Sequence, residues 1–227
     1  MNPSEVPAIV RMFNIYKRFE KMPALSDISL EIYSGEMVFI TGPSGAGKTT
    51  FLKLLYMAET ATAGQLLIGG LNLARMKSSK LYQLRRKFGI IFQDFKLIPS
   101  MTVFENVSLV LEAMGEKKKL IDKKVSKVLR TVGIEEKKDL YPPSLSGGEQ
   151  QRAAVARAVI GEPDIILADE PTGSLDPESA VIIMDLLREF NQKGTTLIIA
   201  THSRELIKSN RGRVIQLNKG KLVEEVL

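Results

Sequence analysis

The chain has 227 residues, of which 44% are hydrophobic and 26% are charged, and its formal net charge is +6. These proportions are ordinary for a globular domain with its own core. The positive charge fits a phosphate ligand, a nucleic acid or an anionic membrane surface without choosing among them. The absence of cysteine excludes disulfides, thiolate metal sites and a cysteine nucleophile, and the single histidine, His202, excludes a histidine-rich metal site.

Membrane-spanning and secretory segments are not expected. No apolar run reaches the roughly 20 residues that cross a bilayer, and residues 1–5 lack the basic and then apolar pattern of a secretory signal. We therefore expect a protein that stays inside the cell, either soluble or peripheral on a membrane.

Short apolar runs rich in β-branched residues predict the strands. Three of these runs are almost wholly apolar, which is typical of strands buried on both faces of a parallel sheet. The three are Met37–Thr41, Ile165–Ala168 and Thr196–Ala200, and the other predicted strands are Ile9–Phe13, Ile28–Ile32, Gln65–Ile68, Ile90–Phe92, Val214–Leu217 and Leu222–Glu225.

Helix signals lie between the strands. Thr102 and Glu105 form a capping box, and Asp176 with Pro177 supplies a cap and a first-turn proline. The helices predicted from these signals and from the position after the third strand are Lys48–Tyr56, Val103–Met114 and a helix that runs through Phe190.

The stretch from Thr102 to about Ile160 predicts helices and no strand, hence a helical insertion in an α/β chain. Within it, Gly115–Lys127 holds six lysines. A charge run of this kind usually forms a solvated helix face, and contact with lipid head groups is the alternative.

Residues 42–49, Gly-Pro-Ser-Gly-Ala-Gly-Lys-Thr, match the phosphate-loop pattern between an apolar strand and a predicted helix. Glycines let the backbone fold closely around phosphate oxygens, and the helix N-terminus attracts the anion. Lys48 would reach the β- and γ-phosphates, and the Thr49 hydroxyl would ligate Mg²⁺. The alternative, a strand–helix turn without a ligand, does not account for the whole pattern in this context.

The apolar run from Ile165 ends in two carboxylates, Asp169 and Glu170. The last residues of a buried parallel strand emerge at the carboxyl edge of the sheet, where ligands of α/β proteins bind. Asp169 would hold Mg²⁺, and Glu170 could act as the general base on the attacking water. Taken alone, the two carboxylates could simply mark a strand that ends at the surface. The phosphate loop in the same chain favours the functional interpretation.

Residues 145–150, Leu-Ser-Gly-Gly-Glu-Gln, contain a capping box made by Ser146 and Glu149. A cap alone does not require Gly147 and Gly148, which weaken a first turn. Small residues there would let a phosphate approach the helix N-terminus. Because the chain already has a phosphate loop, this second anion site suggests a second copy of the chain.

With these motifs in place, nearly the whole chain resembles the ATP-binding-cassette (ABC) ATPases, whose signature is the hexapeptide at 145–150. The resemblance implies an α/β fold: a RecA-like P-loop NTPase core with an antiparallel β-subdomain and an inserted all-helical signature subdomain. It places the core at residues 1–92 and 161–227 and the helical subdomain at 93–160 of a single ATPase domain.

The resemblance also assigns roles. Gln93 would sense Mg²⁺ and the γ-phosphate, His202 would contact the γ-phosphate, and Phe19 would stack on adenine, unless it is a buried core residue. The implied catalytic residues are Glu170, His202, Gln93 and Lys48; the ATP-binding residues are Phe19, Gly42, Pro43, Ser44, Gly45, Ala46, Gly47, Lys48, Thr49 and Thr50, with Ser146, Gly147, Gly148 and Glu149 acting on the partner's ATP; the Mg²⁺ ligands are Thr49, Gln93 and Asp169; and Ser174 and Asp176 communicate across the dimer.

The implied mechanism is a head-to-tail homodimer that closes on two ATP molecules and opens after their hydrolysis. An integral membrane partner is expected to dock near Phe92–Val107 on the cytoplasmic side of the membrane. Residues 167–173 resemble the mechanotransmission subgroup, and residues 35–53 and 84–107, with Asp94, resemble its cell-division members. This predicts an ATPase that controls cell-wall hydrolases at the division site. Ser174 and Ser203 depart from the subgroup, which usually has Asn and Asp there.

Three alternatives remain open. The chain could be the ATPase subunit of a lipoprotein-releasing or macrolide-type exporter, because such proteins share every catalytic residue. A nucleic-acid-linked ABC protein would use the positive charge, but the sequence has no recognisable nucleic-acid module. A P-loop kinase would have no use for the second phosphate site at 146–148.

Overall fold

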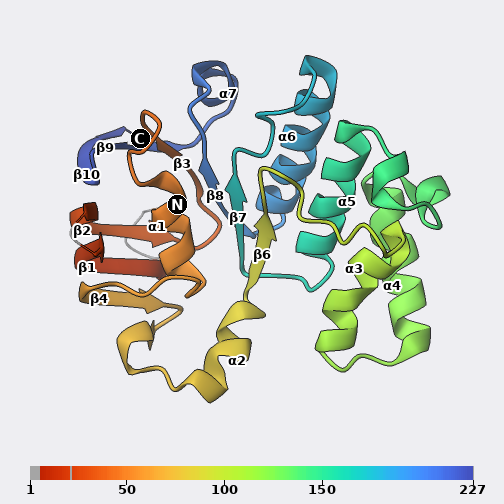
Figure 1. Cartoon of the computed structure of the whole chain (residues 1–227), viewed down its shortest axis with the longest axis horizontal. Coiled ribbons are helices and arrows are strands. Elements are labelled where there is room, and N and C mark those ends of the chain that lie inside the picture. Colours follow the sequence, from red (N-terminus) through yellow and green to blue (C-terminus); the bar gives the residue numbers. More distant parts are fainter. Residues whose placement is uncertain (1–5, 21, 227) are drawn as a thin grey trace. The chain divides into compact units, whose positions relative to one another are not determined.

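The computed structural model describes residues 6–20 and 22–226, so the prediction about a secretory signal, which rests on residues 1–5, lies outside the described residues. By its contacts the chain divides into two compact units. Figure 1 labels the helices and strands in chain order. Unit 1 contains the residues up to Arg85 and those from Asn191 onward, and unit 2 contains Arg86–Phe190. No helix within the described residues is long and apolar enough to cross a membrane.

Unit 1 contains an antiparallel sheet in the order β2-β1-β4-β5. Along β1, apolar side chains such as Val10, Met12 and Ile15 point into the core, while exposed residues lie between them. This alternation is typical of a sheet with one solvated face. The strands are β1 (Ala8–Phe19), β2 (Met22–Tyr33), β4 (Ala63–Ile68) and β5 (Leu71–Asn72).

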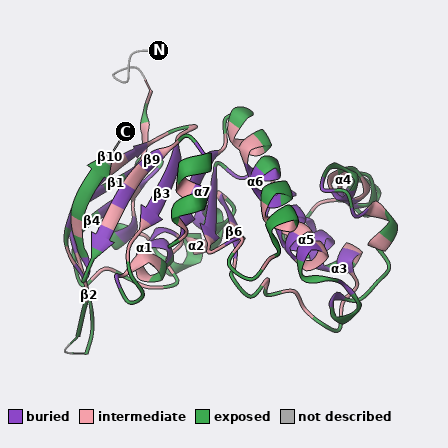
Figure 2. Ribbon diagram, turned by 90° about the horizontal axis from the view of Figure 1, so that it is seen from above, coloured by how far each residue is buried: buried purple, intermediate pink, exposed green. Residues whose placement is uncertain are grey.

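A second group of strands in unit 1 is built around β3 (Met37–Thr41), which runs parallel to β8 (Thr196–Ala200) and β9 (Arg213–Asn218). β10 (Lys221–Val226) pairs with β9 in the antiparallel sense. Burial of almost every residue of β3 and β8 (Figure 2) explains why both appear in the sequence as apolar runs. The helices of unit 1 are α1 (Lys48–Leu55), α2 (Leu81–Arg85) and α7 (Arg204–Ser209), with 3-10 turns at Leu73–Arg75 and Ser78–Lys80.

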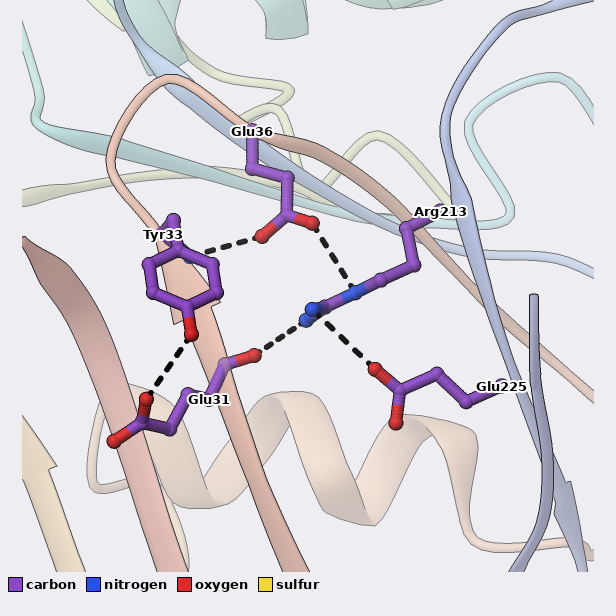
Figure 3. A network of polar contacts seen from close by, with 5 residues as sticks. All are labelled: Glu31, Tyr33, Glu36, Arg213 and Glu225. Carbon is purple, nitrogen blue, oxygen red and sulfur yellow. Dashed lines mark hydrogen bonds and ion pairs between the residues drawn. The ribbon is translucent and has the colours of Figure 1, made fainter. Parts of the chain in front are cut away.

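A buried arginine joins four segments of unit 1 (Figure 3). Arg213, which is 8% exposed, pairs with Glu36 at 3.1 Å and with Glu225 at 3.3 Å, and donates to the Glu31 carbonyl. Burial raises the pKa of Glu36 above its usual value of 4.5, although the Tyr33 amide and Arg213 favour its charged form. The guanidinium thus ties β9 and β10 to β2 and to the turn that precedes β3.

Unit 2 contains the parallel pair β6 (Phe88–Ile91) and β7 (Ile165–Asp169) and a group of helices. The helix α5 is largely buried (Figure 2), whereas α4 buries only one stripe of apolar residues, at Ile121, Val125 and Leu129. The spacing of that stripe is that of one helix face, and most of the lysines of α4 lie outside it and are exposed. The helices are α3 (Val103–Ala113), α4 (Lys118–Thr131), α5 (Gly147–Val159) and α6 (Pro177–Gln192).

The helix α3 begins at the capping box that the sequence predicts. The Thr102 amide donates to the Glu105 carboxylate at 2.7 Å, and the Glu105 amide donates to the Thr102 hydroxyl at 3.2 Å. Each partner satisfies a backbone group that a helix end leaves without an intrahelical bond. These hydrogen bonds hold the pKa of Glu105 below its usual value of 4.5.

The lowered pKa of Glu105 makes the stability of α3 depend on pH. A carboxyl whose pKa is lowered by folding stabilises the fold above its unfolded value, and this contribution is lost as the pH falls through the folded value. We expect Glu105→Gln to lower the free energy of unfolding at pH 7 and to lower it less as the pH approaches 3. Urea unfolding across this range measures the difference. Glu136→Gln removes an equally exposed charge outside any cap and serves as the control; a Glu105→Gln effect independent of pH would contradict the prediction.

Candidate functional site

The phosphate loop follows β3 in unit 1, and His202 follows the neighbouring strand β8. The two strands are parallel and pair Ile40 with Ala200, so their carboxyl ends meet at one edge. His202 is exposed at that edge. Within unit 1 the structure therefore brings the loop and the only histidine of the chain to the same edge, as the sequence predicts.

Two glycines fix the path of the phosphate loop. Gly42 has φ +146° and Gly47 has φ +106°, a region that side chains disfavour. A Cβ on Gly42 would clash with the Leu217 carbonyl of β9, and a Cβ on Gly47 would lie 2.7 Å from the Ala24 carbonyl of β2. On this side the loop therefore packs closely against the backbone of β2 and β9.

The other side of the loop is open. A Cβ on Gly45 would meet no atom within 4 Å, and Gly47, the N-cap of α1, has no side chain that could occupy the amides of the first turn. The Lys48 ammonium donates to the Gly42 carbonyl at 2.9 Å and to the Pro43 carbonyl at 3.3 Å. A cation over a loop with open space and a helix N-terminus fits the phosphates of a nucleotide.

Phe19, at the end of β1, is 43% exposed, which excludes the alternative of a buried core residue. The Lys17 ammonium lies 4.6 Å from the centre of the Phe19 ring and also pairs with Glu59 at 2.8 Å. An ammonium over a ring face is attracted by the electrons of the ring. The sequence analysis did not identify Lys17 as a neighbour of Phe19. The signal was available, because residues two apart on a strand lie on the same face of the sheet.

In unit 2, Gln93 and the two carboxylates lie at the ends of neighbouring strands. The parallel strands β6 and β7 pair Ile91 with Ala168, so both strands end at the same edge. Gln93 comes after β6 at that edge, Asp169 is the last residue of β7, and Glu170 comes directly after it. Glu170 is half-buried and has φ +46°, and its carbonyl accepts a hydrogen bond from the Gly173 amide at 3.1 Å. A non-glycine residue in this conformation costs roughly 1–3 kcal/mol, and such residues cluster at functional sites.

The segment after Gln93 also has an unusual backbone. Phe95 and Lys96 have φ of +58° and +50°. The Arg157 guanidinium, from α5, donates to the Lys96 carbonyl at 2.5 Å and to the Phe95 carbonyl at 2.7 Å. Burial lowers the pKa of Arg157, because desolvation disfavours its charge. A hydrogen bond from Lys96, at 2.6 Å, holds the pKa of Asp94 below its usual value.

Sequence reasoning missed Arg157. The only signal was a charged residue within the otherwise apolar run Ala153–Ile160.

The residues of the 145–150 hexapeptide form the N-terminus of α5. Ser146 caps the helix: its amide donates to Glu149 at 2.8 Å and its hydroxyl accepts from the Glu149 amide at 3.3 Å, which lowers the pKa of Glu149. The Ser146 hydroxyl also interacts with the Glu149 carboxylate, which lowers the pKa of Glu149 further. Gly147 is exposed, and a Cβ there would make only ordinary contacts, the nearest 3.7 Å from Leu175.

Gly148 has a packing reason of its own, because a Cβ there would clash with the Ser179 hydroxyl of α6. Packing therefore explains Gly148 without a ligand. The prediction that a phosphate approaches this helix end rests on the exposed pair Ser146 and Gly147.

Asp176, from the predicted set, and Ser203, which departs from the subgroup pattern, each cap a helix. Asp176 accepts a hydrogen bond from the Ser179 amide at 2.8 Å at the start of α6, and this lowers its pKa. Ser203 accepts from the Leu206 amide at 3.2 Å and caps α7. Serine and aspartate are similarly good N-caps, so the departure at Ser203 preserves the local fold. Ser174 is exposed.

No group of three or more His, Asp or Glu side chains in residues 6–20 and 22–226 is placed to hold a metal ion. Mg²⁺ in nucleotide sites is usually held by one or two protein groups together with phosphate oxygens and water. Thr49, on the exposed first turn of α1, and Asp169, at the end of β7, are oxygen donors of the required type. These residues fit Mg²⁺ bound together with a nucleotide.

A glycine loop between a buried parallel strand and a helix, with a second strand that ends in carboxylates, defines a P-loop NTPase. The model of the ABC transporter family matches residues 25–173. The chain belongs to this family, and it is an ATP-binding and ATP-hydrolysing subunit of the ABC type.

Relatives cover almost the whole chain. It is 44% identical over 218 residues to the cell division ATP-binding protein FtsE of Bacillus subtilis, with 96% of each chain covered. It is 46% identical over 203 residues to FtsE of Mycobacterium tuberculosis, with 89% of this chain and 88% of the relative covered. A dimeric structure of the ATP-binding cassette MJ0796 in a post-hydrolysis state with ADP and Pi matches with a TM-score of 0.87 and 35% identity, covering 96% and 97% of the two chains.

Proposed function

We propose that this ATPase works as the FtsE subunit of an FtsE–FtsX-type complex, in which its ATP cycle acts through a membrane partner to activate cell-wall hydrolases during division. The observation that carries the proposal is the identity of 44–46% to proteins named FtsE over about nine-tenths or more of the chain. The complex would act on the cytoplasmic side of the membrane at the division site.

The chain's own residues supply the chemistry of hydrolysis. The loop from Gly42 to Thr49 binds the phosphates, with the Lys48 charge on the β- and γ-phosphates. Glu170 takes a proton from the attacking water, and Gln93 and His202 orient the γ-phosphate and that water. Bound Mg²⁺, held by Thr49, Gln93 and Asp169, would neutralise charge on the phosphate oxygens. The Phe19 ring, with one face under Lys17, offers its other face to adenine.

The second phosphate site belongs to a partner copy. Ser146 and Gly147 are exposed at the N-terminus of α5, where the first-turn amides and the helix dipole favour an anion. We assign them, with Gly148 and Glu149, to the γ-phosphate of an ATP bound by the other subunit of a head-to-tail homodimer. The dimeric state of the MJ0796 cassette supports this arrangement. Ser174 and Asp176 would carry the contact between subunits.

The membrane partner decides between this function and the exporter alternative. We expect tagged Glu170→Gln protein, purified from membranes of its own host with ATP and Mg²⁺, to recover an FtsX-like protein together with division or cell-wall factors. Recovery of a lipoprotein-release or macrolide-export permease would overturn the division role and leave the ATPase chemistry intact.

A matched pair of exposed serines tests where the partner docks. Ser100 lies in the proposed docking segment Phe92–Val107, and Ser79 lies in a 3-10 turn of unit 1. We expect Ser100→Arg to reduce recovery of the partner and Ser79→Arg to leave it unchanged. Equal recovery with both variants would place the docking surface elsewhere.

A further inference from the structure

Arg157 connects the segment after Gln93 to the helix that begins at the signature hexapeptide. Arg157 and Gly147 are ten residues apart on α5, which is about 15 Å along a helix. Helical side chains point back toward the N-terminus of their helix. The Arg157 guanidinium meets the Phe95 and Lys96 carbonyls at 2.7 and 2.5 Å.

The ring of Phe95 completes the connection. Its Cζ lies 4.0 Å from the position that a Cβ on Gly147 would occupy, and the Leu175 side chain is 3.7 Å from the same point. The Phe95 residue therefore contacts Arg157 through its carbonyl and approaches the signature glycine through its ring. Arg157, Phe95 and Gly147 therefore lie in a row, with the Phe95 ring next to the open side of Gly147, and all of them are within unit 2.

We propose that Arg157 is a positioning residue for ATP hydrolysis: it clamps the left-handed turn at Phe95–Lys96, and thereby fixes Gln93 relative to the signature end of α5. The inference rests on the proposed role of Gln93 in hydrolysis. It adds a physical link that works in both directions. A movement of the Gln93 segment displaces Ser146 and Gly147, and a movement of Ser146 and Gly147 displaces the Gln93 segment.

The shape of arginine suits this clamp. Two consecutive carbonyls accept hydrogen bonds from two nitrogens of one planar group, and the fixed fork of a guanidinium can serve both at once. The ammonium of a lysine is a point charge and has no such fork. Two adjacent residues with positive φ are unfavourable, so the turn needs contacts of this kind to persist.

The test compares Arg157→Lys with Arg130→Lys. Arg130 is the matched control, because it also makes a two-nitrogen contact in unit 2, with Glu135 at 2.7 and 2.8 Å, but on an exposed surface. Amide hydrogen exchange reports the opening of residues 93–97, and steady-state ATP hydrolysis separates kcat from KM. Arg157→Gln, which leaves no buried charge, gives the same comparison if the lysine variant does not fold.

We expect Arg157→Lys to speed exchange at residues 93–97 by about tenfold or more, with exchange in the middle of α5 unchanged. The kcat should fall by at least about tenfold, because a shift of about 1 Å in a positioning group can cost about 100-fold in rate. The KM should stay within about twofold, because most of the predicted ATP-binding residues, including the whole phosphate loop, are in unit 1. Arg130→Lys should change none of these.

A double-mutant cycle with Gln93→Ala isolates the coupling. If Arg157 acts through Gln93, the fold-loss of kcat in the double variant will be smaller than the product of the fold-losses in the two single variants. Unchanged exchange at residues 93–97, or a kcat equal to that of Arg130→Lys, would overturn the clamp. Full kcat in Gln93→Ala would instead refute the proposed role of Gln93, and with it the coupling, whatever the exchange rates show.

Discussion

Glu170→Gln should retain ATP binding and lose at least about 99% of its turnover, because a general base contributes about 100- to 10,000-fold to a rate. The substitution keeps the size of the side chain and the backbone hydrogen bond from Gly173 to the Glu170 carbonyl. The negative charge and the capacity to accept a proton are removed. Phosphate release measures turnover, nucleotide titration measures binding, and size-exclusion chromatography with ATP should show a stable dimer.

Glu162→Gln is the matched control for this result. Glu162 is another glutamate of unit 2 with a positive φ, +52°, and it is exposed after the end of α5. Its substitution tests whether a glutamine in such a conformation is tolerated, and it should leave turnover unchanged. Turnover of Glu170→Gln close to that of Glu162→Gln would show that Glu170 is not the base.

Lys48→Ala should weaken ATP binding by about 100-fold or more, since hydrogen bonds to charged groups contribute about 1.5–3 kcal/mol each and this lysine serves two phosphates. The loop itself should persist. The Ala46 amide still donates to the Pro43 carbonyl at 3.1 Å, and the Phe51 amide to the Gly47 carbonyl at 2.8 Å. The substitution therefore removes the charge at the site and the two hydrogen bonds from Lys48 to the Gly42 and Pro43 carbonyls.

Titration calorimetry with ATP and Mg²⁺ measures this loss directly. Lys53→Ala removes an exposed lysine from the last turn of the same helix and should bind ATP normally. Unchanged affinity in Lys48→Ala would refute the assignment of the phosphate loop. A reduced affinity in both variants would trace the effect to α1 rather than to the site.

Strands buried on both faces were predictable, and half-exposed strands were predicted too short. β3 and β8 have the bounds that their apolar runs predict. β1 continues to Phe19, whereas the apolar run ends at Phe13. The reason is an irregularity at Asn14, which has φ +45° and donates to Asp27 at 2.8 Å while the pairing register with β2 shifts. The short helices α2 and α7 were not predicted, because six or fewer residues give no clear periodicity.

The contiguous part of the candidate site was predictable, because the glycine loop, the acidic strand end and the hexapeptide each carry a local pattern. Contacts between distant segments were not. The packing of Gly148 against Ser179 and the reach of Arg157 to Phe95 depend on how helices and loops of unit 2 meet. No local pattern encodes such contacts, so they became visible only in the folded chain.

The arginine that joins four segments of unit 1 constrains how this protein can change during evolution. Removing Arg213 would leave Glu36 and Glu225 near one another without their cation. Breaking a buried pair costs about 3–5 kcal/mol, and this applies to Glu36 rather than to Glu225, whose side chain is 39% exposed. Lysine is a poor replacement, because one ammonium lacks the fork that serves two carboxylates and a carbonyl. Substitutions at these three positions are therefore expected to covary. Homologues without the arginine should also lack the two acids.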